Sequence, residues 1–314
     1  MHSGRFFATN ERIMIIPPNL AEGDLIYITA PAKATDAASV QYTKSFLEAH
    51  GFRVLLSKHC LGAHRYFSGT DEERSADMQF GIDHPDVKAI LCARGGYGCV
   101  RIVDQINWAN MLREPRWLIG FSDITVFHHR LMRLGVQSIH GSMPLNFEKN
   151  TPEALETMLT ILQGEKPVIS CGVNAANQVG SAEGVLMGGN LSIVYSLLGT
   201  DDRLNFDGGI LFLEDLAEQL YHLDRMFFAL KKAGAFSKIK GLIIGGMTDL
   251  EDTDNPTGLS IDEIVSHHFR YSKIPICYDF PIGHFEDNRS VIVGADVKLE
   301  VGDTGVSLSY LNSF

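Results

Sequence analysis

Residues 117–134, WLIGFSDITVFHHRLMRL, join an apolar strand to an amphipathic helix with almost no connection between them. The run from Trp117 to Phe121 is typical of a buried strand. Apolar residues then recur at the spacing of one helix face: Ile124, Phe127, Leu131 and Leu134. Ser122 lies where the strand gives way to the helix. The stretch therefore predicts a strand, a sharp turn and a helix, which is the basic unit of an α/β fold.

The same alternation is present upstream of this stretch. Strand-like runs occupy residues 25–28, 53–56 and 87–92, and the polar run 71–83 is typical of a helix between two of them. Strands separated by helices imply βαβ units and a parallel sheet. Because functional sites of such sheets lie at the carboxyl ends of the strands, residues that follow the strands are the first candidates.

The sequence changes character after a predicted helix at 152–162. A polar stretch follows it, and we expect a first domain over residues 1–163, a linker at 164–180 and a second domain over 181–314. The second domain has strand-like runs at 210–213 and 242–244 with a helix from about 218 to 232 between them. Near the C-terminus, alternating segments separated by glycines predict hairpins: 291–293, 297–301 and 306–310. We therefore expect a smaller, mixed and strand-rich second domain.

The composition excludes several classes of protein. The chain has 314 residues, of which 45% are hydrophobic and 21% charged, and its net charge is −11. Without a dense stripe of Lys and Arg, binding to nucleic acid or to an anionic membrane is not expected. Five cysteines without a C-x-x-C pair favour reduced thiols and a cytoplasmic protein. No apolar run approaches a membrane span, no secretory signal is recognisable, and residues 1–20 are expected to be a loose extension.

Ser122 and a glycine-rich loop are the first candidate functional features. A serine on a strand-to-helix turn is exposed as a nucleophile would be, although Ser122 could instead cap the helix. The loop Arg94-Gly95-Gly96-Tyr97-Gly98 follows the strand at 87–92. It could cradle a phosphate, supply backbone N–H groups to an oxyanion beside Ser122, or form a plain turn.

Glu214 and His284 are the remaining candidates for catalysis. Glu214 ends an apolar strand and needs a partner if it is buried, whereas Asp215 is better suited to favour the N-terminus of the next helix. On that helix Glu218, Tyr221 and Arg225 share a face, which could be no more than a solvated one. Of twelve histidines, His284 has the most suitable loop context. The adjacent histidine pairs at 128–129 and 267–268 diverge in a helix, and we expect neither a metal nor a cofactor.

Taken together, these residues resemble the LD-carboxypeptidases, serine peptidases that trim the murein tetrapeptide during cell-wall recycling. The stretches that carry the resemblance occur in the order found in that family: Arg94–Gly98, Leu118–Thr125, His140-Gly141, Gly188–Leu191, Glu214-Asp215 with Glu218, Tyr221 and Asp224-Arg225, and Gly283-His284. The resemblance implies a flavodoxin-like, parallel-sheet N-terminal domain and a smaller strand-rich C-terminal domain. It also implies a homodimer.

The resemblance further assigns roles to individual residues. Ser122 would be the nucleophile, His284 the base and Glu214 the carboxylate that orients it. The backbone N–H groups of Gly96 and Asp123 would form the oxyanion hole. The substrate would be a peptide with an L-to-D bond before a terminal D-alanine. Four side chains are expected to contact it: Arg94, Tyr97, Tyr221 and Arg225. Of these, Arg94 and Arg225 could hold its free carboxylate.

Three alternatives stay open from the sequence. Microcin-immunity hydrolases, which cleave acylated nucleotide-like toxins, lie within the same family, but they would need an aromatic residue to stack on the base. The two tryptophans, Trp108 and Trp117, lie outside the second domain. A non-catalytic binding protein would not explain the serine, glutamate and histidine at strand ends. A nucleotide-binding oxidoreductase would need a phosphate-binding fingerprint after the first strand, where the sequence has Thr29-Ala30-Pro31-Ala32.

Overall fold

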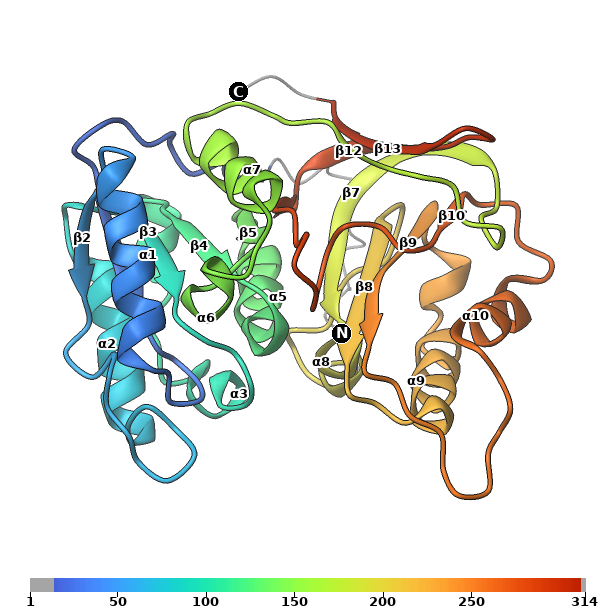
Figure 1. The fold of residues 1–314 in the computed structure, drawn as a ribbon, viewed down its shortest axis with the longest axis horizontal. Coiled ribbons are helices and arrows are strands. Elements are labelled where there is room, and N and C mark those ends of the chain that lie inside the picture. The colour runs from blue at the N-terminus through green and yellow to red at the C-terminus, as the bar shows by residue number, and fades with distance from the viewer. Residues whose placement is uncertain (1–13, 312–314) are drawn as a thin grey trace, which may run out of the picture.

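Two β-sheets organise residues 14–311, the part of the chain that the computed structural model describes (Figure 1). The first sheet has the strand order β11-β5-β4-β3-β1-β2. Its strands are β1 (Leu25–Thr29), β2 (Arg53–Leu56), β3 (Val87–Cys92), β4 (Trp117–Gly120), β5 (Ser138–His140) and β11 (Val291–Val293). The strands β1 to β5 are parallel, as the alternation of strands and helices predicts.

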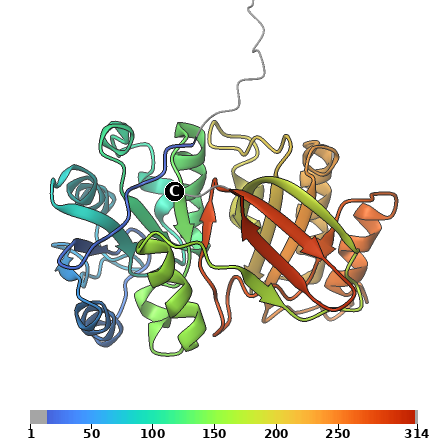
Figure 2. The ribbon, with the colours of Figure 1, turned by 90° about the horizontal axis from the view of Figure 1, so that it is seen from above.

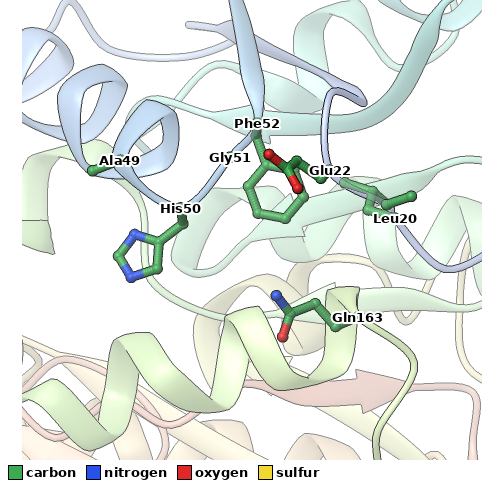
Figure 3. Close-up of a pocket in the computed structure, with 8 residues that line it drawn as sticks. Leu20, Glu22, Ala49, His50, Gly51, Phe52 and Gln163 are labelled. Carbon is green, nitrogen blue, oxygen red and sulfur yellow. The ribbon is translucent and has the colours of Figure 1, made fainter.

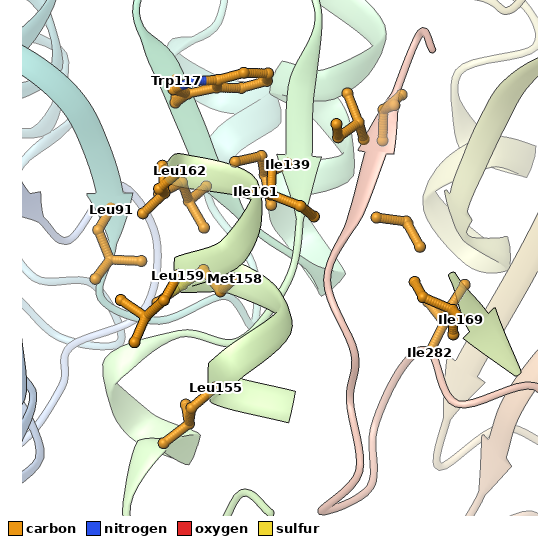
Figure 4. Packing of buried hydrophobic residues seen from close by; sticks show 14 of the residues in the cluster. Leu91, Trp117, Ile139, Leu155, Met158, Leu159, Ile161, Leu162, Ile169 and Ile282 are labelled. Carbon is orange, nitrogen blue, oxygen red and sulfur yellow. The ribbon is translucent and has the colours of Figure 1, made fainter. Parts of the chain in front are cut away.

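Helices cover both faces of this sheet. They are α1 (Ala37–Ala49), α2 (Asp71–Asp83), α3 (Cys99–Ile102), α4 (Ala109–Arg113), α5 (Thr125–Leu134), α6 (Pro144–Phe147) and α7 (Pro152–Leu162). Apolar residues of α1, α6 and α7 pack in one core cluster, and those of α2 to α5 pack in another. Because successive side chains of a strand point to opposite faces, the strands supply residues to both clusters. Figure 4 shows α7 on one face of the sheet, with Leu162 and Leu159 near Trp117 and Leu91.

Local signals define where the helices begin and end. At α2, the Thr70 hydroxyl accepts a hydrogen bond from the Glu73 N–H at 3.2 Å, and the Glu73 carboxylate accepts one from the Thr70 N–H at 2.8 Å. This reciprocal capping box satisfies two N–H groups that the first turn leaves free. The helix α5 ends at Gly135, whose φ of +81° is incompatible with a right-handed helix.

The second sheet is mixed and has the order β10-β9-β8-β7-β12-β13-β6. Its strands are β6 (Ile169–Cys171), β7 (Gly180–Asn190), β8 (Ile210–Leu216), β9 (Gly241–Thr248), β10 (Ile276–Cys277), β12 (Asp296–Val301) and β13 (Val306–Tyr310). The strands β7 to β10 are parallel, and β12, β13 and β6 are antiparallel. The helices α8 (Leu191–Ser196), α9 (Leu220–Lys232) and α10 (Ile261–Phe269) pack on one face. The predicted α/β class, with a strand-rich second sheet, is confirmed.

The two sheets lie side by side and share apolar packing between them (Figure 2). One core cluster contains Ile139 of the first sheet, Phe212 of the second and Ile282 from the loop before β11. The prediction of a hairpin at β12 and β13 is confirmed. The prediction that residues 291–293 belong to the same set of hairpins is wrong, because β11 pairs antiparallel with β5 in the first sheet. All three residues of β11 are buried, as expected of a strand covered on both faces.

Two further segments differ from expectation. The stretch 164–180, predicted as a linker, contains β6, whose pairing with β13 ties that stretch to the second sheet. Of the predicted N-terminal extension 1–20, residues 1–13 lie outside the described residues. Residues 14–20 are held on the first domain, since the Ile15 N–H donates to the Gly135 carbonyl and the Leu20 N–H to the Leu162 carbonyl, both at 2.7 Å. Among residues 14–311, no helix is long and apolar enough to cross a membrane.

Candidate active site

Ser122 lies on a strained turn at the carboxyl end of β4. Its φ is +62°, a left-handed backbone conformation that side chains with a Cβ rarely adopt. Such a conformation costs about 1–3 kcal/mol and persists only where the surrounding structure enforces it. The hydroxyl caps neither the 3₁₀ turn Ser122–Ile124 nor α5, because neither element has a side-chain cap at its start. The alternative that Ser122 is a helix cap is therefore wrong.

The glycine-rich loop after β3 packs directly on this turn. A Cβ at Gly95 would lie 3.1 Å from the Cβ of Ser122 and 3.2 Å from the backbone nitrogen of Asp123. A side chain at this position would press on the serine turn, so glycine favours this close approach of the loop. Next to it, Gly96 has a φ of +99° and Gly98 a φ of +148°. The loop therefore borders the serine turn, where a loop that stabilises an oxyanion has to be.

Asp123 ties the serine turn to the end of the glycine loop. Its side chain is 1% exposed, and one carboxylate oxygen accepts a hydrogen bond of 2.8 Å from the backbone N–H of Cys99. Burial raises the pKa of Asp123 above the usual range of an aspartate, and the hydrogen bond from Cys99 offsets part of that rise. Asp123 thus has a structural carboxylate as well as a backbone N–H group beside Ser122.

His284 and Glu214 form a close pair beside the serine turn. The Nδ1 of His284 donates a hydrogen bond of 2.5 Å to the Oε2 of Glu214, whose side chain is fully buried in β8. The imidazole ring packs on Phe121, the residue before Ser122, with 4.8 Å between ring centroids. Burial alone lowers the pKa of His284, but the charge of Glu214, the hydrogen bond that His284 donates to Glu214, and the charge of Asp215 raise it above its ordinary value. A histidine whose Nδ1–H is bound by a buried carboxylate has the arrangement that a general base and its orienting group require.

Backbone contacts hold the loop that carries His284. Gly283 has a φ of +117°, and a Cβ there would lie 2.7 Å from the Cβ of Glu214. The Gly283 N–H donates to the Asn288 side-chain oxygen at 2.8 Å, and the Thr248 hydroxyl donates to the His284 carbonyl at 3.2 Å. The close approach of His284 to Glu214 thus depends on a residue without a side chain at 283.

Asp215 supports a different helix from the one that the sequence suggests. Its carboxylate accepts hydrogen bonds of 2.9 Å from the Ser192 N–H, in the first turn of α8, and from the Asn190 side chain. The expectation that it favours the N-terminus of the following helix, α9, is wrong, because β7 and its helix α8 lie beside β8 in the sheet. Burial and the neighbouring Glu214 raise the pKa of Asp215 to about 7.

The four predicted substrate contacts lie on two separate elements. Arg94 donates a hydrogen bond of 3.1 Å to the Ala34 carbonyl, and Tyr97 in the same loop is 47% exposed. Tyr221 and Arg225 lie on α9, with the guanidinium 5.4 Å from the centre of the tyrosine ring. Within residues 14–311, neither of these two forms a hydrogen bond, ion pair or ring contact with the serine, glutamate or histidine described above.

Thr125 and Asn190 are structural contacts of the site that the sequence analysis did not assign. The Asn190 N–H donates a hydrogen bond of 3.1 Å to the Thr125 hydroxyl, and a Cβ at Gly189 would lie 2.5 Å from that hydroxyl. The signal in the sequence was the run Gly188-Gly189-Asn190, which permits close approach of a backbone. Only the folded chain shows that the approaching group belongs to the other domain.

A surface pocket in the first domain lies away from this site. It has a volume of about 410 Å³ and is lined by Leu20, Glu22, His50 and Phe52 among others (Figure 3). These residues precede β1 and β2, so the pocket is at the amino ends of the strands, whereas Ser122 follows the carboxyl end of β4. The pocket is therefore not part of the candidate active site.

Histidines elsewhere in the first domain have structural contacts. His128 and His129 are buried, with ring nitrogens 2.8 Å from the Gly120 carbonyl and 3.2 Å from the Asp202 carbonyl, respectively. Over the described range 14–311, no group of three or more His, Cys, Asp or Glu side chains is arranged to hold a metal ion.

Comparison with known proteins decides the family. The profile of the LD-carboxypeptidase N-terminal domain matches residues 26–141, and that of the LD-carboxypeptidase C-terminal domain matches residues 183–299. The chain belongs to the LD-carboxypeptidase family. It is 30% identical over 290 residues to the murein tetrapeptide carboxypeptidase of Pseudomonas aeruginosa, with 88% of this chain and 92% of that protein covered.

Solved structures agree with this assignment. The muramoyltetrapeptide carboxypeptidase from Oxalobacter formigenes superposes with a TM-score of 0.84 at 27% identity, over 92% of this chain and 99% of that one. MccF in complex with glutamyl sulfamoyl guanosine shares the fold, with a TM-score of 0.83 at 19% identity over 96% of this chain and 100% of that one. The predicted family is confirmed, and these LD-carboxypeptidase relatives identify the chain as a peptidase of the carboxypeptidase type.

Proposed function

We propose that this LD-carboxypeptidase is a serine peptidase that releases the terminal D-alanine of murein tetrapeptides. The observation that carries the proposal is the His284–Glu214 pair at 2.5 Å, packed against the residue that precedes the strained Ser122. A base, its orienting carboxylate and a partly exposed serine on a sharp turn are the parts of a serine hydrolase triad. The named activity of the relatives in Pseudomonas aeruginosa and Oxalobacter formigenes supports the choice of substrate.

The mechanism follows from these positions. The Nδ1–H of His284 is engaged by Glu214, which leaves Nε2 to take the proton of Ser122 as its hydroxyl attacks the scissile carbonyl. Glu214 fixes the tautomer and stabilises the imidazolium that forms. The imidazolium then protonates the leaving amine of D-alanine. Water, activated by the neutral imidazole, hydrolyses the acyl-enzyme and regenerates the serine.

The oxyanion of the tetrahedral intermediate would be bound by the backbone N–H groups of Gly96 and Asp123. The packing of Gly95 on the Ser122 turn supports this assignment, since it brings the loop next to the residue that follows the serine. Removing one oxyanion donor typically costs about 3–4 kcal/mol of transition-state stabilisation. Tyr97 and Tyr221 are the proposed aromatic contacts of the substrate, and both are exposed.

The alternatives are less well supported. Trp108 and Trp117 are 5% and 0% exposed, so neither is available to stack on the base of an acylated nucleotide. A non-catalytic binding protein would have no need for a buried carboxylate beside a histidine and a strained serine. Action in the cytoplasm and assembly as a homodimer form part of the proposal. The first rests on the unpaired cysteines and the second on the family resemblance.

The deciding experiment measures D-alanine release from a murein tetrapeptide by the wild-type chain and by Ser122→Ala. Loss of the serine nucleophile costs about 10⁶-fold in kcat in subtilisin, so the variant should release almost nothing. A circular dichroism melt confirms that both proteins are folded. Release that survives Ser122→Ala would contradict the serine mechanism, and a folded wild type that releases no D-alanine would contradict the substrate.

A further inference from the structure

Lys33 lies against the glycine loop of the proposed oxyanion hole. It follows β1 at the carboxyl edge of the first sheet, and its backbone N–H donates to the Gly95 carbonyl at 3.3 Å. A Cβ at Gly96 would lie 3.0 Å from the Cβ and 3.3 Å from the Cδ of Lys33. The stem of the lysine therefore packs on Gly96. The neighbouring residue of the same loop, Gly95, packs on the Ser122 turn.

Tyr66 completes this arrangement from the loop after β2. The Lys33 ammonium lies 4.7 Å from the centre of the Tyr66 ring, and the Tyr66 hydroxyl would be 2.9 Å from a Cβ at Gly96. The two loops are joined by a hydrogen bond of 3.1 Å from the Ala34 N–H to the Tyr66 carbonyl. The stem of Lys33 and the hydroxyl of Tyr66 thus border the same glycine, and the ammonium lies over the tyrosine ring.

Among the described residues, no other protein group competes for the donors of these two side chains, and Tyr66 is 42% exposed. Within residues 14–311, Lys33 forms no ion pair and the Tyr66 hydroxyl forms no hydrogen bond. The neighbouring cations are engaged differently. Arg74 and Arg101 both pair with Asp71, and Arg94 donates to the Ala34 carbonyl. Four cationic side chains therefore gather at this loop with one carboxylate paired to them, although the chain as a whole has a net charge of −11.

We propose that Lys33 and Tyr66 bind the free carboxylate of the substrate's terminal residue and so make the enzyme a carboxypeptidase. This inference rests on the function proposed above. In a peptide, only the amide nitrogen and one Cα separate the scissile carbonyl carbon from the terminal carboxylate. A carbonyl oxygen bound at Gly96 therefore brings the carboxylate to the side chains that border that glycine. An ammonium and a phenol are suitable donors for it.

The test compares two substrates on the intact protein: a murein tetrapeptide with a free terminal carboxylate, and the same peptide as a C-terminal carboxamide. The readout is the ratio of kcat/KM for the acid to that for the amide, from the release of D-alanine and D-alaninamide. In Lys33→Met this ratio should fall about 10- to 100-fold, the range of a lost hydrogen bond to a charged group. Tyr66→Phe should also lower the ratio, by about 10-fold or more, because the phenol's hydrogen bond to the same charged carboxylate is lost.

Two matched variants define the control. Lys33→Arg keeps the charge and should keep the ratio within about threefold of wild type. Lys240→Met removes one exposed positive charge just before β9, at the opposite end of the strands from the site, and should leave the ratio unchanged. Thermal melts confirm that each variant is folded.

The outcomes separate this inference from the proposed function. If the wild type cleaves neither substrate, the proposed function fails and the role of Lys33 fails with it. If the wild type cleaves the acid but Lys33→Met lowers kcat/KM equally for the acid and the amide, the proposed function stands and the carboxylate-binding role of Lys33 is overturned. The role of Lys33 would also be overturned if the acid-to-amide ratio fell in Arg94→Met and stayed unchanged in Lys33→Met. A ratio that falls in Lys33→Met and survives in Lys33→Arg supports the proposal.

Discussion

The backbone N–H of Asn190 donates a hydrogen bond of 3.1 Å to the hydroxyl of Thr125, and this bond joins the two domains next to the site. Thr125 begins α5, directly after the turn that carries Ser122. Asn190 ends β7 and lies opposite Glu214 in the register with β8. This hydrogen bond therefore links the segment of the proposed nucleophile to the strand that ends beside the proposed orienting carboxylate. Catalysis should depend on domain packing even where no catalytic residue is changed.

Thr125→Val tests this dependence. The substitution keeps the shape of the side chain but leaves the buried Asn190 N–H without its acceptor, which should lower the free energy of unfolding by about 1–3 kcal/mol. Because small misplacements of reacting groups are costly, kcat should fall between about 10- and 100-fold. Denaturant unfolding and D-alanine release measure the two effects.

Thr43→Val is the matched control for this variant. Thr43 is also fully buried, on α1, but its hydroxyl has no hydrogen-bond partner within residues 14–311. The control should keep its kcat. Equal losses of kcat in the two variants would show that the link between the domains does not position the site.

Glu214→Gln should reduce kcat by about 10⁴-fold, as the corresponding change does in other serine peptidases, because the amide no longer fixes the tautomer or stabilises the imidazolium. The pH profile gives a second, independent readout. Burial lowers the pKa of His284 and Glu214 raises it, so removing the carboxylate should lower that pKa. Since the base must be neutral to accept a proton, activity rises with pH through the pKa of His284.

The acidic limb of kcat/KM should therefore move to lower pH in Glu214→Gln. In the wild type the limb should lie above the ordinary histidine pKa of about 6.5. A limb that stays in place, or moves to higher pH, would mean that the titration belongs to another group.

Gly283→Ala should disable the site while leaving the rest of the fold intact. Its Cβ would lie 2.7 Å from the Cβ of Glu214, a distance that no side chain keeps, so the loop with His284 has to move away from its partner. We expect kcat to fall by at least about 100-fold, since a displacement of about 1 Å can cost that much. Release of D-alanine under saturating substrate measures the loss.

Gly23→Ala separates the steric clash from backbone strain. Gly23 also has a positive φ, +85°, but a Cβ there meets no atom within 4 Å. This variant should lose some stability, because alanine is strained at positive φ, and should keep its kcat. If both alanine variants lost activity equally, the clash with Glu214 would not be the cause.

The sequence predicts the first domain well because its signals are local. The apolar run of β3, the capping box of α2 and the strand-turn-helix stretch around Ser122 each depend on neighbours in the chain, and β3 and α2 have the predicted bounds. The pairing of β11 with the first sheet depends instead on β5, a strand that is distant in the sequence. The sequence of such a short, valine-rich strand does not indicate which strand it pairs with.

The candidate site, too, has features that the local sequence predicts and features that it does not. Ser122, Glu214 and His284 could be singled out because each follows or ends an apolar run. Their mutual distances could not be inferred, and neither could the partner of Asp215, which lies on a helix after the neighbouring strand. Lys33 cannot be predicted as a site residue because the sequence around it has no functional motif. Only its packing on Gly96 in the folded chain indicates a role.

Asp215→Asn should change how stability varies with pH. Burial and Glu214 raise the pKa of Asp215 in the folded chain to about 7, whereas its ordinary value is 3.8. The folded state therefore holds a proton that the unfolded state releases, so this group stabilises the fold at low pH and loses that contribution as pH rises from about 4 to 7. Asparagine does not titrate, and the variant should gain about 2–3 kcal/mol relative to wild type between pH 5 and pH 8. Urea unfolding of both proteins at the two pH values measures the difference. The control is Asp303→Asn, in the exposed turn between β12 and β13, which accounts for the general effect of replacing one carboxylate by an amide. A gap between Asp215→Asn and wild type that is the same at both pH values would show that Asp215 is already charged throughout this range, held so by the Ser192 N–H and Asn190.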